Sequence, residues 1–123
     1  LSCALCLPLA EPVHAAPPEL LVAVGAGGEE QFEAAFIKQA ETWEAVAKQA
    51  GSKIKAIGLA PAPEGESGSD LDQLLGHLAK AAEPGDDSPL WLVLIGHGTF
   101  DGLEARFNLR GPDLAADKLA EAL

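Results

Sequence analysis

A histidine between two glycines, Gly96-His97-Gly98, is the segment of this chain best suited to chemistry. It follows the apolar run Leu90–Ile95, which predicts a buried β-strand. In an open parallel sheet, ligands bind beyond the carboxyl ends of the strands, where His97 could act as a general acid or base. The N–H of Gly98 could stabilise an oxyanion at the same place. The alternative interpretation is an ordinary turn after a buried strand.

Asp101 follows closely and is a candidate for orienting His97 or lining a substrate pocket. Because Asp101 precedes Gly102, a turn residue is the alternative. The other histidines lie elsewhere: His77 flanks the apolar stripe of a predicted helix, and His14 lies near the N-terminus. No His, Cys and acidic residues have the spacing of metal ligands, so we expect no metal and no cofactor.

Two other motifs suggest different chemistry and fit their patterns poorly. Gly25–Gly28 resembles a dinucleotide loop, but Glu30 stands where the third glycine belongs. Acidic side chains at this helix start would also repel a pyrophosphate. Gly65–Gly68 is no nucleophile elbow of an α/β-hydrolase, because residue 69 is Ser where glycine is required. An α/β-hydrolase whose reactive serine lies downstream of Leu123 remains an alternative.

Apolar runs, helical periodicity and glycine or proline breaks alternate along the chain. An order of strand, helix, strand, helix, strand, hairpin and helix predicts an α/β fold in three layers, with a mainly parallel sheet covered on both faces. The expected elements are strands over Leu20–Val24, Ile54–Leu59 and Leu90–Ile95, helices over Glu29–Ala50, from Ser69 and from Pro112-Asp113 to Leu123, and a small hairpin within Phe100–Leu109.

The amino-acid composition argues against two classes of binding partner, nucleic acids and anionic membranes. Eight basic and 19 acidic residues give a net charge of −11, whereas nucleic-acid-binding surfaces are basic. The same charge argues against anionic membrane surfaces. Aromatic residues make up only 5%, so a platform for stacking bases is not expected. Hydrophobic residues make up 48%, which is sufficient for a folded core.

The N-terminal segment is typical of a targeting signal. Leu1–Ala10 is as apolar as the central region of a signal peptide and too short to span a membrane. Val13-His14-Ala15 matches a cleavage site, so we expect a signal peptide over residues 1–15 and a domain over 16–123. Cys3 and Cys6, the only cysteines, would be removed with the signal. The exported protein would be periplasmic or extracellular, without membrane insertion after cleavage. A disordered apolar tail or an N-terminal strand is the alternative.

Residues 90–114, LWLVLIGHGTFDGLEARFNLRGPDL, resemble the His-Gly segment of bacterial caspase-like and legumain-like cysteine peptidases. Leu20 to about Gly51 is similar to the first strand and helix of the same family. The resemblance implies a caspase–haemoglobinase fold, with His97 as the dyad histidine and Gly98 as the oxyanion-hole glycine. It also implies a catalytic cysteine at the end of a fourth strand, downstream of Leu123.

The family resemblance implies a peptide or protein substrate cut by nucleophilic acyl transfer. We expect the chain to be a fragment truncated at its C-terminus and inactive by itself, since it lacks that cysteine. Specificity does not carry over, because Gly25–Glu30 holds no arginine for an acidic substrate side chain. A catalytically degenerate member serving as an interaction module is the remaining alternative.

Overall fold

The computed structural model describes residues 15–59, 68–85 and 87–123. The predicted signal peptide, except for Ala15, and most of the loop 61–68 lie outside these ranges. The elements are β1 (Glu19–Val24), α1 (Glu30–Ala50), β2 (Ile54–Ile57), α2 (Asp70–Ala81), β3 (Leu90–Ile95), β4 (Gly98–Phe100), β5 (Ala105–Phe107), β6 (Leu114–Ala115) and α3 (Ala116–Ala122).

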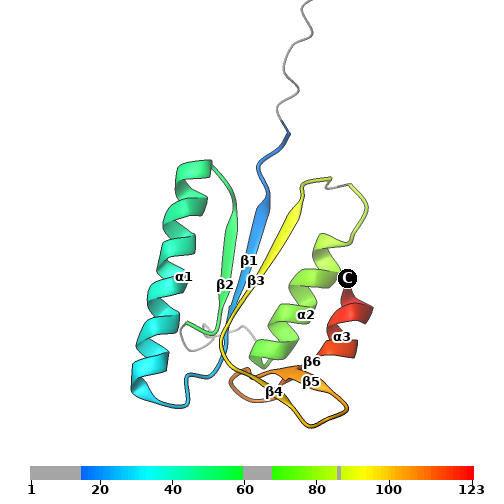
Figure 1. Cartoon of the computed structure of the whole chain (residues 1–123). Coiled ribbons are helices and arrows are strands. Elements are labelled where there is room, and N and C mark those ends of the chain that lie inside the picture. Colours follow the sequence, from blue (N-terminus) through cyan, green and yellow to red (C-terminus); the bar gives the residue numbers. More distant parts are fainter. Residues whose placement is uncertain (1–14, 60–67, 86) are drawn as a thin grey trace, which may run out of the picture.

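A three-stranded parallel sheet forms the centre of the molecule, in the order β2-β1-β3. The chain leaves β1 toward one side to form β2 and later returns to the other side to form β3. The carboxyl ends of β1 and β3 therefore flank the point at which the strand order reverses, where open α/β sheets bind ligands. Figure 1 shows α1 on one face of this sheet and α2 with α3 on the other.

Strand β1 supplies side chains to both cores, since successive side chains of a strand point to opposite faces. Val22 and Val24 pack with Phe36 and Ala40 of α1. Leu21 and Ala23 pack on the other face with a buried stripe on α2. That stripe consists of Leu71, Leu74 and Leu78. This layering confirms the predicted α/β class and the covering of both sheet faces.

The end of α1 and the start of α2 carry recognisable signals. The helix α1 ends at Gly51, whose φ of 67° is the left-handed conformation that glycine adopts easily. The helix α2 starts with a capping box: the Ser69 hydroxyl accepts from the Asp72 N–H, and the Asp72 carboxylate accepts from the Ser69 N–H. The helix start predicted at Ser69 is thus confirmed.

A second, antiparallel sheet of order β4-β5-β6 lies beyond the carboxyl end of β3 (Figure 1). Its first two strands are the predicted hairpin, although β4 begins earlier, at Gly98. The prediction that Pro112 and Asp113 open the third helix is wrong. Asp113 instead accepts a hydrogen bond from the Leu109 N–H, and β6 intervenes before α3 begins at Ala116.

The second strand is also shorter than predicted, because it ends at Ile57 and not at Leu59. The next residue, Gly58, has a φ of 92°, which turns the chain out of the strand. A side chain on Gly58 would collide with the carbonyl oxygen of Val24. Glycine at this position therefore lets β2 end directly against the end of β1.

Candidate functional site

Two glycine-rich turns, Gly25–Gly28 after β1 and Gly96–Gly98 after β3, lie side by side at the carboxyl ends of these strands. The Gly25 N–H donates to the carbonyl of Ile95 at 2.8 Å, which holds the end of β1 against the end of β3. The Phe107 ring packs over both ends: a Cβ built on Gly25 or on Gly96 would lie 3.2 or 2.9 Å from it. The glycines thus make room for the Phe107 ring at the crevice where the two strand ends meet.

His97 lies two residues beyond the end of β3 and is exposed to solvent. Its ring packs at steep angles against two aromatic side chains of the first turns of α1. The ring centroids are 4.9 Å from Phe32 and 5.1 Å from Phe36, with interplanar angles of 84° and 68°. The imidazole therefore has a defined seat on α1 while part of it faces water, as a group that exchanges protons with a ligand requires.

The Gly98 main chain faces away from its partner strand. Gly98 lies opposite Phe107, and the neighbouring Asn108 N–H donates to the carbonyl of His97 at 3.0 Å. This spacing makes Gly98 and Phe107 a pair without mutual hydrogen bonds, so the main-chain groups of Gly98 point to the open edge of β4. The N–H of Gly98 is accordingly placed to donate to something other than β5.

Asn108 ties this region together through its main chain. Besides the bond to His97, its carbonyl oxygen accepts from the Ala26 N–H at 3.0 Å. A Cβ on Gly25 would collide with that same oxygen. One residue of the β5–β6 connection thus holds both the loop after β1 and the peptide of His97.

The Asn108 carboxamide adds a second set of contacts. Its Nδ2 lies 3.4 Å from the Thr99 hydroxyl and 3.3 Å from an oxygen of Asp113. The amide orientation follows from this geometry, because the reversed one would put two oxygens together. Its Oδ1 is buried and finds no partner among the described residues. Leaving a buried acceptor unpaired costs about 1–3 kcal/mol, so the two contacts of Nδ2 must hold the side chain in place.

Asp101 occupies the tip of the hairpin, which agrees with the turn interpretation. Its Oδ1 accepts from the Leu103 and Glu104 N–H groups, both at 2.9 Å, and its Oδ2 accepts from Arg106 at 3.1 Å. The hydrogen bonds from Glu104 and Leu103, followed by that from Arg106, lower the pKa of Asp101 below 3.8. Within the described part of the chain, no hydrogen bond joins Asp101 to His97.

A partly buried ion pair braces the same edge of the sheet. Asp70, only 6% exposed at the start of α2, accepts two hydrogen bonds from Arg110, at 2.7 and 2.9 Å. This contact raises the pKa of Arg110 above its ordinary value. Sequence reasoning missed the pair, since the two residues are far apart in the chain and only the folded topology brings them together.

Cavities lie at both ends of the parallel sheet. A cavity of about 190 Å³ beside the carboxyl ends of β1 and β2 is lined in part by Gly27, Glu33, Phe36 and Arg110. Phe36, which lines this cavity, also packs against the His97 ring, but His97 is not among the lining residues. The volume of the cavity suits a single side chain of a ligand more than a whole small molecule.

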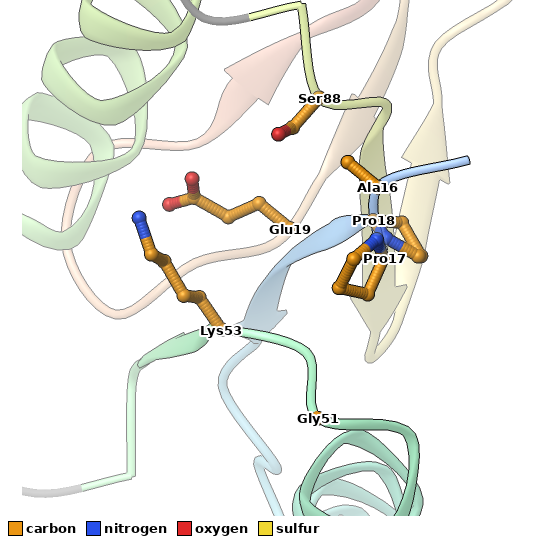
Figure 2. A pocket seen from close by; sticks show the side chains of 7 residues that line it. All are labelled: Ala16, Pro17, Pro18, Glu19, Gly51, Lys53 and Ser88. Atoms are coloured by element: carbon orange, nitrogen blue, oxygen red, sulfur yellow. The ribbon is translucent and has the colours of Figure 1, made fainter. Parts of the chain in front are cut away.

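The opposite end of the sheet holds two wider hollows. Figure 2 shows one of about 230 Å³, where Glu19 and Lys53 extend in the same direction beside Pro17, Pro18 and Ser88. The other, of about 510 Å³, shares Glu19 and Lys53 and includes His77. His77, which the sequence predicts to flank the apolar stripe of its helix, thus lies near the amino ends of the strands, away from His97.

Comparisons with known proteins leave the site to be interpreted from its own geometry. No family model, no curated protein and no solved structure matches the chain. Across residues 15–59, 68–85 and 87–123, no three His, Cys, Asp or Glu side chains gather closely enough to hold a metal ion. In the same ranges, no helix combines the length and apolar character required to cross a bilayer.

Proposed function

We propose that this chain is the N-terminal part of an exported caspase-like or legumain-like cysteine endopeptidase and contributes its general acid–base residue, His97. One observation carries the proposal: an exposed imidazole stands at the carboxyl end of β3, beside the reversal point of the sheet. The Gly98 N–H, pointing to the open edge of β4, supports it as a donor to an oxyanion. The resemblance of residues 90–114 to that family implies the reaction class.

The nucleophilic sulfur belongs to a strand downstream of Leu123. The outer edge of β3 is unpaired within the described chain, so a further parallel strand added there would end beside His97. The thiolate attacks the peptide carbonyl, and the oxyanion that forms accepts a hydrogen bond from Gly98. As the C–N bond breaks, the His97 imidazolium gives its proton to the leaving amine. The neutral imidazole then takes a proton from water, which hydrolyses the thioester.

The remaining parts of the proposal concern export and organisation. Residues 1–15 act as a signal peptide, and residues 16–123 belong to a domain of the caspase–haemoglobinase type, which is periplasmic or extracellular. The chain takes peptide or protein substrates and, without the cysteine, cuts none by itself. Asp101 has the role of a hairpin residue that supports the segment after His97, given that its carboxylate is fully engaged there.

The test is peptide cleavage by the longer protein that includes the next strand. Because general acid–base catalysis contributes about 10²–10⁴ in rate, His97→Ala should lower kcat/KM for a peptide by at least about 100-fold. His77→Ala, at the opposite end of the sheet, is the matched control and should leave cleavage unchanged. Thermal unfolding of both variants checks that each one folds.

Cleavage by the His97→Ala variant at the wild-type rate would remove this residue from the mechanism. A next strand that ends without a cysteine would instead favour the degenerate form, in which the same domain serves as an interaction module.

A further inference from the structure

Asn108 contacts several segments around His97, through both its main chain and its carboxamide. Its N–H binds the carbonyl of His97, and its carbonyl accepts from the loop after β1. Its carboxamide reaches Thr99 on β4 and Asp113 ahead of β6. The Phe107 ring, next to it in the chain, packs closely against Gly25 and Gly96.

Other residue types could make the main-chain contacts of Asn108, but they could not make the two contacts of its carboxamide. It donates to a hydroxyl on β4 and to a carboxylate on the far side of the β5–β6 connection, which demands two donors on one nitrogen. Asp113 is itself fixed, because its other oxygen accepts from the Leu109 N–H at 3.2 Å. The side chain thus ties Asn108 to β4, which follows His97, and to the segment ahead of β6.

We propose that Asn108 is a positioning residue for His97: its carboxamide fixes the main chain that in turn fixes the His97 peptide, and so sets the seat of the imidazole on α1. The functional value of this role rests on the proposed function of His97. The buried, unpaired Oδ1 agrees with it, since a residue serving stability alone would gain by losing that acceptor.

The test uses the spectrum of the His97 ring in this chain. Phe32 and Phe36 lie about 5 Å from the ring, so their ring currents shift its proton resonances, and both rings give nuclear Overhauser contacts to it. Asn108→Ala should move those resonances and weaken both contacts. Asn108→Asp should do the same, because it opposes the carboxylate of Asp113 with a second one.

A paired exchange provides the rescue. Asn108→Asp combined with Asp113→Asn keeps one amide, one carboxylate and the net charge, with the amide now at position 113 donating to the carboxylate at position 108. The His97 resonances and contacts should return toward the wild-type values. His77→Ala, at the opposite end of the sheet, is the control and should leave the His97 ring signals in place.

The proposal is overturned if Asn108→Ala lowers the unfolding midpoint but leaves the His97 ring signals unchanged, or if the paired exchange restores stability and not the ring signals. Should Asn108→Ala fail to fold, Thr99→Val deletes one partner of the carboxamide and is judged by the same signals. The ring signals are measured without any cleavage reaction. The positioning role of Asn108 and the proposed peptidase activity can therefore fail independently, in different experiments.

Discussion

The ionisable side chains around the ends of β1 and β3 differ in how many hydrogen bonds they already make within the protein. Asp101, Asp113 and Asp70 each accept two or more hydrogen bonds from the protein, so they are committed to shaping the chain. The His97 ring makes aromatic contacts on one side and is otherwise exposed. Among these side chains, the imidazole is the group with chemistry left to offer a ligand.

Asp101 should make the stability of the chain depend on acid. The hydrogen bonds from Glu104, Leu103 and Arg106 lower its pKa in the folded state below 3.8. Its contribution is therefore present above pH 3.8 and is lost as the pH falls below 3.8 through the lowered pKa. Asp101→Asn should reduce the urea midpoint at pH 7, and the difference from wild type should vanish at the acid end. Two parallel curves over the whole pH range would contradict this assignment.

At the scale of elements, local signals predicted the order of strands and helices but not all of their ends. Apolar runs and helical periodicity placed β1, α1 and β3, and the Ser69 signal placed the start of α2, because these depend on neighbours in the sequence. The end of β2 at Gly58 and the delayed start of α3 depend on contacts with Val24 and Leu109. Those contacts exist only in the folded chain.

Two glycines should respond oppositely to alanine. Gly76 lies inside α2, and a Cβ there meets nothing within 4 Å, so Gly76→Ala should stabilise the chain by about 0.5–1 kcal/mol through helix propensity. Gly25→Ala would press against the Asn108 carbonyl and should destabilise the folded chain by about 1–3 kcal/mol. Urea unfolding of the two variants measures both signs. A stabilised Gly25→Ala would show that the crevice is looser than the structure indicates.

At the scale of the molecule, the predicted layers are present, but the network around His97 could not be predicted. The sequence pointed to Gly96-His97-Gly98 because a histidine after an apolar strand is visible locally. The Asn108 contacts and the Asp70–Arg110 pair join distant segments across the end of the sheet, and no spacing in the sequence signals them. Asn108 lies within residues 90–114, and the sequence marks it only through the family resemblance of that segment.

The unpaired edge of β3 should govern how the isolated chain behaves at high concentration. β3 carries no charge or proline, whereas the other outer strand, β2, is shorter and contains Lys55. Exposed apolar edges of this kind pair with other chains. Trp91→Lys, at an edge residue 53% exposed, should therefore reduce concentration-dependent association measured by light scattering.

Val46→Lys is the matched control for that edge, since Val46 is 49% exposed on α1 and the substitution changes the net charge equally. If charge repulsion alone limits association, both variants should scatter more by the same amount, because one added lysine lowers the net negative charge from −11. If the β3 edge is responsible, only Trp91→Lys should scatter less, and adding the proposed downstream strand should have the same effect, because it would occupy that edge. Equal behaviour of the two variants would exclude the edge as the contact.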